Sequence, residues 1–147
     1  IGLNGVIAGQ VADLAAENQN PCEEMVDYIH FNKTSTLIRA AIRLGALSAN
    51  VSQSDLDLLS SYGEKIGMAF QIQDDILDEV GLSKNIGKNV KSDYKKSKMT
   101  YPHVHGMNAA KHKVKSLTND AIRELTFISR DTTILEKFAL FLLERDK

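Results

Sequence analysis

Apolar residues recur every three or four positions along most of the chain, and no segment alternates regularly between apolar and polar residues. The first spacing is typical of helices and the second of strands, so the pattern predicts an all-α fold. The stretch between Gly81 and Pro102 is polar, lysine-rich and poorly periodic, and we expect mostly loop there, with room for one helical turn. The predicted helices are residues 3–17, 23 to a break near 32, 34–49, 54–80, 106–129 and 133–145.

The first predicted helix carries a narrow polar stripe, formed by Gln10, Asp13 and Glu17. Such a stripe faces either bulk water or an internal polar cavity, and the apolar remainder of the helix is wide enough to be buried. Both interpretations stay open. The helix predicted at 34–49 instead shows one continuous apolar stripe. That stripe consists of Leu37, Ala40, Ala41, Leu44 and Leu47.

The length of 147 residues fits one compact domain or one half of a larger one, at about 100 to 200 residues per domain. The sequence is 43% hydrophobic and 25% charged, which is the composition of an ordinary soluble globular protein. Its 18 basic and 19 acidic residues give a formal net charge of −1, so no global field attracts nucleic acid or an anionic membrane surface. Any electrostatic function must therefore be local.

A single cysteine, Cys22, excludes an internal disulfide framework and a cysteine-rich zinc site, and this fits a reducing cytoplasm. No apolar run approaches the roughly 18 residues of a membrane span. We therefore expect a cytoplasmic protein without stable membrane insertion. Because the sequence begins at Ile1 within an apolar stretch, we also expect the natural chain to start upstream.

Three carboxylates share one face of the helix predicted at 54–80: Asp74, Asp75 and Asp78, with Gln71 and Gly67 beside them. Like charges three or four positions apart cost about 0.2–0.5 kcal/mol per pair, and no Lys or Arg lies nearby in the helix to offset them. Bound Mg²⁺ would offset them, because it prefers oxygen ligands and is usually held by one or two carboxylates plus substrate phosphates. The opposite, apolar face comprises Ile66, Ala69, Ile72, Ile76, Leu77 and Val80.

A solvated acidic helix end is the alternative to a metal site, and a DDxxD pattern by itself favours that alternative. Gln71 and Gly67 on the same face shift the balance toward a ligand. We interpret Gly67 as a small residue that lets a ligand approach the helix closely.

The chain becomes basic after this helix. Lys88 follows a glycine that would let the backbone approach a ligand, which makes it the stronger candidate for phosphate binding, and Lys98 is the weaker one. Six lysines lie between residues 84 and 98: Lys84, Lys88, Lys91, Lys95, Lys96 and Lys98. For most of them a solvated loop remains the alternative.

Lys33 and Thr34 lie at the expected helix break, which would free backbone carbonyls as well as side chains to face a site. A Lys-Thr pair is uninformative by itself. The four histidines, His30, His103, His105 and His112, lack a consistent metal-ligand spacing, so we assign them no role.

The most informative segments, in chain order, are GQVADL at 9–14, HFNKT at 30–34, LIRA at 37–40, GA at 45–46, GMAFQIQDDILD at 67–78, GK at 87–88, Asp93, Lys98 and TYP at 100–102. Together they resemble the trans-type polyprenyl diphosphate synthases, and within these the bacterial farnesyl diphosphate synthase type. The resemblance spans nearly the whole chain. It implies the isoprenoid synthase helical bundle, with residues 1–147 as the carboxyl-terminal portion of one domain.

The resemblance also implies a reaction. Mg²⁺ helps an allylic diphosphate to release pyrophosphate, isopentenyl diphosphate attacks the allylic cation, and loss of a proton completes a short-chain product such as farnesyl diphosphate. By position, Asp74, Asp75 and Asp78 match the second aspartate-rich motif, with Asp74 as the favoured direct magnesium ligand.

Further roles follow by position in the same way. Lys33, Lys88 and Lys98 would hold the allylic diphosphate, while Thr34 and Gln71, with the Lys33 carbonyl, would turn the negative ends of their dipoles toward the cation. Two more groups are implied: Phe70, beside the isopentenyl tail, and the end of the chain, where Arg145 and Lys147 resemble a basic tail interrupted by Asp146.

Family members also carry a first aspartate-rich motif that is absent here, so we expect residues 1–147 to be inactive alone. The family further implies a homodimer, whereas the residues themselves do not show one. The alternatives that remain are a geranylgeranyl or longer-chain synthase, a terpene cyclase of the same fold, and a non-catalytic helical subunit. The glycine before Lys88 and the Lys33-Thr34 pair favour condensation over cyclisation.

Overall fold

The computed structural model describes residues 1–17, 19–20, 22–85 and 99–145, and every regular element in these ranges is helical. This confirms the predicted all-α fold. The elements are the π-helical segment η1 (Gly2–Val6), α1 (Ile7–Ala15), α2 (Glu23–His30), the π-helical segment η2 (Phe31–Ser35), α3 (Thr36–Ser48), α4 (Gln53–Asn85), α6 (Tyr101–His105), α7 (Met107–Leu125) and α8 (Thr133–Glu144).

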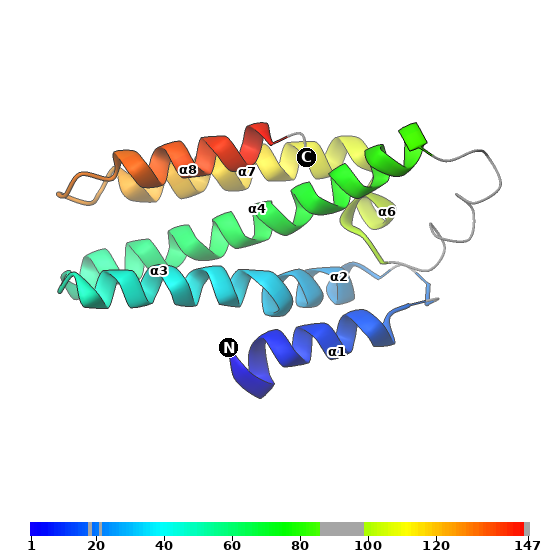
Figure 1. Cartoon of the computed structure of the whole chain (residues 1–147), viewed down its shortest axis with the longest axis horizontal. Helices are drawn as coiled ribbons and strands as arrows, with labels where there is room; N and C mark the ends of the chain where they lie inside the picture. The colour runs from blue at the N-terminus through cyan, green and yellow to red at the C-terminus, as the bar shows by residue number, and fades with distance from the viewer. Residues whose placement is uncertain (18, 21, 86–98, 146–147) are drawn as a thin grey trace.

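The long helix α4 runs through the middle of the bundle (Figure 1). On one side it packs against the rod formed by α2, η2 and α3, and on the other against α7 with α8. The first helix, α1, lies outside the α2–α3 rod and contacts η2. None of the helices in the described part of the chain is long and apolar enough to cross a membrane.

Two buried clusters lie along α4, one toward each end. The predicted apolar face of α4 supplies both: Ile72 and Ile76 belong to the cluster shared with α2, α6 and α7, and Ile66 to the cluster shared with α7 and α8. These three side chains are at most 4% exposed. The amphipathic pattern of this helix therefore determines which face turns inward and, by exclusion, where its carboxylates point.

The prediction that the helix breaks near Asn32 is wrong, although the helix geometry does change there. The chain leaves α geometry over Phe31–Ser35 but stays helical, so α2, η2 and α3 make one continuous rod. A π-helical turn inserts an extra residue without ending the helix, and such turns are frequent at functional sites. Within it, Thr36 donates its hydroxyl to the Asn32 carbonyl at 2.6 Å.

The predicted apolar stripe of α3 faces largely outward in this chain, and so do large apolar side chains of α1. Leu44 on α3 is 63% exposed and Val11 on α1 is 61% exposed, while Ile38, Ile42 and Ala46 form the face of α3 that packs inward. Helix α3 is apolar on two sides, so periodicity alone could not select the buried one.

Tyr62 is completely buried in α4, and its hydroxyl donates to the Leu135 carbonyl at 2.8 Å. Burial raises the pKa of Tyr62 from 10.0 to about 12. Between these values the unfolded chain has released a proton that the folded chain keeps. The folded state is therefore favoured fully below pH 10, and this contribution is lost as the pH rises through the pKa of the folded form.

We expect Tyr62→Phe to lower the free energy of unfolding of the intact protein by about 1 kcal/mol at neutral pH, because one buried hydrogen bond is lost. It should also reduce the alkaline loss of stability. Urea unfolding of both proteins at pH 7 and at a pH between 10 and 12 measures the two effects. Equal pH dependence in the two proteins would contradict the assignment to Tyr62.

Candidate functional site

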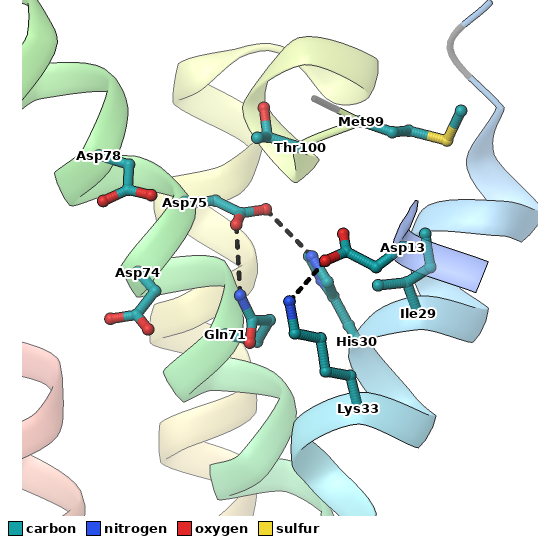
Figure 2. Close-up of a pocket in the computed structure, with 10 residues that line it drawn as sticks. All are labelled: Asp13, Ile29, His30, Lys33, Gln71, Asp74, Asp75, Asp78, Met99 and Thr100. Atoms are coloured by element: carbon teal, nitrogen blue, oxygen red, sulfur yellow. Dashed lines mark hydrogen bonds and ion pairs between the residues drawn. The ribbon is translucent and has the colours of Figure 1, made fainter. Parts of the chain in front are cut away.

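A cavity of about 230 Å³ opens where α1, α2, η2 and α4 meet the segment that precedes α6. Figure 2 shows its lining, with the acidic face of α4 across from the rod of α2 and η2. Two predicted groups meet here that are far apart in sequence: Lys33 and the aspartates of α4. The lining residues are Asp13, Ile29, His30, Lys33, Gln71, Asp74, Asp75, Asp78, Met99 and Thr100.

The three aspartates of α4 all line the cavity, yet their environments differ. Asp78 is exposed and the Asp74 side chain is 42% exposed, whereas Asp75 as a residue is only 8% exposed. Within the described ranges, no three acidic, histidine or cysteine side chains converge closely enough to hold a metal ion by themselves. The separate carboxylates of Asp74 and Asp78 would suit Mg²⁺, which proteins usually hold with one or two carboxylates together with waters and a phosphate ligand.

Asp75 is held by three groups of the protein. Its Oδ2 lies 3.0 Å from His30 Nε2 and accepts a hydrogen bond of 2.8 Å from the Tyr101 backbone N–H. Its Oδ1 accepts a longer one, 3.4 Å, from Gln71 Nε2. The side chain is thereby tied to α2 and α6 as well as to its own helix. His30 received no role from the sequence, although its position one turn before Lys33 places both on one side of the helix.

Asp74 is paired with Arg145, whose guanidinium Nη2 donates to Asp74 Oδ1. The same guanidinium lies 4.4 Å from the centroid of the Phe70 ring, and Gln73 Nε2 donates to the Arg145 carbonyl at 3.0 Å. No basic residue in the surrounding helix offsets the charge of Asp74, but one from the far end of the chain does. Because Arg145 is far from Asp74 in the sequence, the sequence pattern could not identify it as the counter-ion.

Lys33 reaches across to α1, where its Nζ donates to Asp13 Oδ2 at 2.6 Å. Asp13 therefore faces the cavity, while its stripe partners Gln10 and Glu17 are exposed. Each of the two interpretations of the polar stripe thus holds for part of it.

Thr34 donates its hydroxyl to Gln71 Oε1 at 2.6 Å, which links η2 to α4. Both side chains are only partly buried. With the Gln71 contact to Asp75, a continuous chain of hydrogen bonds runs from Thr34 through Gln71 to Asp75. The Gln71 amide thus turns its NH₂ toward Asp75 and its oxygen toward Thr34.

Two glycines allow this close approach of three helices. A Cβ on Gly67 would lie 2.5 Å from the Ser35 Cα, and a Cβ on Gly9 would lie 2.3 Å from the Lys33 backbone nitrogen. The sequence interpretation of Gly67 as a place where a ligand approaches is therefore wrong. A neighbouring backbone occupies that space instead.

Among the described residues, two predicted site residues, Phe70 and Thr34, do not line the cavity. Phe70 is half-buried and packs under Arg145 without lining the cavity. Lys88, Lys98 and Lys147 lie outside the described residues.

Comparison with known proteins adds three findings. The family model described as "Polyprenyl synthetase" matches residues 2–133. The farnesyl diphosphate synthase of Escherichia coli K12 is 42% identical over 99% of this chain and 50% of its own length, and that of Bacillus subtilis 168 is 36% identical over 99% and 49%. The chain thus spans about half the length of these curated relatives.

A solved structure extends the similarity to the fold. The geranyltransferase of Helicobacter pylori, crystallised with magnesium and isoprenyl diphosphate, superposes with a TM-score of 0.74 at 26% identity, covering 97% of this chain and 46% of that one.

Proposed function

The chain belongs to the polyprenyl synthetase family, and from this we propose that it forms the carboxyl-terminal part of a magnesium-dependent prenyltransferase. The enzyme would condense an allylic diphosphate with isopentenyl diphosphate to a short-chain product such as farnesyl diphosphate. The observation that carries the proposal is the placement of three carboxylates opposite Lys33 in one cavity. A merely solvated acidic helix end would not face a lysine of another helix across a cavity.

Asp74 and Asp78 are the carboxylates with room for a metal ion, because they are the more exposed of the three and both line the cavity. Bound magnesium would neutralise the charge that develops on the departing diphosphate. The Asp74 carboxylate is already balanced by Arg145, so metal and arginine would compete for the same oxygens or share them. Asp75 would contribute to the electrostatics of the site while held by the protein.

Lys33 would hold diphosphate oxygens from the side opposite the carboxylates. Its ammonium is balanced by Asp13, which keeps it extended toward the cavity. Lys88 and Lys98 are assigned the same role by their position in the family pattern. Phe70 would pack beside the isopentenyl tail, and Arg145 and Lys147 would approach the second diphosphate.

Thr34 and Gln71 would stabilise the allylic cation through their dipoles. A neutral oxygen can do this without forming an ester, whereas a free carboxylate at the same place could trap the cation. The hydrogen bond between Thr34 and Gln71 fixes the distance between the two oxygens at 2.6 Å. Of the two residues, Gln71 lines the cavity and Thr34 holds its amide oxygen from η2.

The outward apolar faces of α1 and α3 suit the same proposal. Leu44 and Leu47 are exposed and recur along one helix, and contiguous apolar patches are unusual on the surface of a monomeric protein. We assign these faces to contacts with the rest of the enzyme, including a second subunit of a homodimer.

Turnover is the direct test. The intact protein should convert allylic and isopentenyl diphosphates to a prenyl diphosphate in the presence of Mg²⁺, and a chelator should abolish this. Product analysis separates farnesyl from geranylgeranyl or longer chains. Absence of any condensation product from folded, magnesium-loaded protein would contradict the proposal, and turnover by purified residues 1–147 would contradict the assignment of the chain as an incomplete part.

A further inference from the structure

His30 is one of the least exposed side chains of the protein, at 2%, although it borders the cavity. Its ring lies between two partners of different kinds. Nε2 is 3.0 Å from Asp75 Oδ2, and the ring stacks on Tyr101 with 6.1 Å between centroids and 23° between planes. Burying a polar ring costs free energy unless its nitrogens form hydrogen bonds.

The contacts of His30 define which nitrogen carries hydrogen. A carboxylate accepts hydrogen bonds and donates none, so Nε2 must be protonated to bond Asp75. The contact therefore requires a hydrogen on Nε2. Nδ1 is buried and has no hydrogen-bond partner among the described residues.

The orientation of Asp75 in turn constrains Gln71. Because the carboxylate can only accept, the Gln71 amide must turn its NH₂ toward Asp75 and its oxygen toward the Thr34 hydroxyl. The 3.4 Å contact to Asp75 is long, so it orients the amide only while Asp75 itself is held still. His30 and the Tyr101 N–H are the groups that hold it.

We propose that His30 is a positioning residue that acts through Asp75. By holding that carboxylate with its Nε2–H, His30 fixes Asp75 in the cavity lining beside Asp74 and Asp78 and thereby sets the direction of the Gln71 amide. Figure 2 shows the path, with His30 and Gln71 joined to the two oxygens of Asp75. This inference rests on the proposed function.

Two substitutions separate hydrogen bonding from packing. His30→Phe keeps an aromatic ring for the stack on Tyr101 but removes the donor, whereas His30→Gln loses the ring and places an amide N–H near the position of Nε2. His112→Phe, at an exposed site on α7, is the control for loss of a histidine. All three are made in the intact protein.

Two measurements are made on each variant. The first is the shift in melting temperature produced by Mg²⁺ with inorganic pyrophosphate, which reports binding without turnover. The second is kcat and KM for the allylic diphosphate. We expect His30→Phe to raise the concentration of Mg²⁺ needed for half of the thermal shift by about 10- to 100-fold, because a released Asp75 would disturb the carboxylates beside it in the cavity. It should also lower kcat more than it changes KM, because Gln71 would lose its fixed orientation.

The pattern across variants decides the outcome. Recovery of most of the magnesium response in His30→Gln, with His112→Phe like the parent, supports the proposal. A His30→Phe protein that binds magnesium and turns over like the parent overturns it, and so does a His30→Gln protein as impaired as His30→Phe, since packing would then be the whole effect. Should His30→Phe fail to fold, His30→Gln alone decides. An increase of more than tenfold in the Mg²⁺ concentration that His30→Gln needs for half of the thermal shift would then overturn the proposal. If the parent shows neither magnesium response nor product, the proposed function fails instead.

Discussion

Asp74→Asn is expected to reduce kcat/KM of the intact protein by about 10²- to 10³-fold, because it removes the charge of a carboxylate that we propose holds the metal on the departing diphosphate. The substitution preserves side-chain shape, so packing should change little. Of the two aspartates with room for a metal ion, Asp74 is the one tied to Arg145, and the Asn variant also leaves that guanidinium without its negative partner. Steady-state kinetics with varied Mg²⁺ measures the effect, and the requirement for Mg²⁺ should rise as well.

Asp57→Asn provides the matched control. Asp57 lies on the same helix as Asp74 but is exposed near the opposite end and does not line the cavity. It should leave kcat/KM within about twofold, since substitutions at exposed positions away from special contacts are nearly neutral. If folded Asp74→Asn enzyme kept activity similar to that control, Asp74 would not be a metal ligand.

The largest expected effect on stability comes from Gly67→Ala. The new Cβ would lie 2.5 Å from the Cα of Ser35 and 3.0 Å from its Oγ, and a backbone atom cannot move aside by changing rotamer. Helices α4 and η2 would have to separate, and we expect the free energy of unfolding to fall by about 3 kcal/mol or more. Gly9→Ala should act similarly, with 2.3 Å to the Lys33 nitrogen.

Gly81→Ala is the comparison on the same helix. Nothing lies within 4 Å of the Cβ that it would add, so it should stabilise α4 by about 0.5–1 kcal/mol through lower backbone entropy in the unfolded chain. Urea unfolding of all three variants measures the differences. Similar stability for Gly67→Ala and Gly81→Ala would show that the tight contact with Ser35 is not maintained in solution.

Much of the site was visible in the sequence because its residues sit on strongly periodic helices. Asp74, Asp75, Asp78 and Gln71 share one face of α4. Of the apolar positions predicted opposite them, four are buried and two are partly buried; the buried ones are Ile66, Ala69, Ile72 and Ile76, and the partly buried ones are Leu77 and Val80. Lys33 could be selected as a candidate but not placed, since periodicity describes a helix without its neighbours.

The misassigned features have a common cause. Gly67 looked like a place for a ligand, and Leu44 looked like part of a buried stripe, because a single sequence shows that a position is small or apolar but not what lies across from it. His30 was passed over for the same reason. Its meaning depends on Asp75, which comes from a different helix.

By itself, the sequence determined the helical class, the start of α4 and the face of that helix that carries the carboxylates, because these depend on short-range periodicity and side-chain chemistry. The helix runs on to Asn85, beyond the predicted end at residue 80. Only the tertiary structure decided that Arg145 balances Asp74, that His30 and the Tyr101 N–H hold Asp75, and that Lys33 stands across the cavity paired with Asp13. Those partners come from separate helices, and their meeting depends on how the helices pack, which no local pattern encodes.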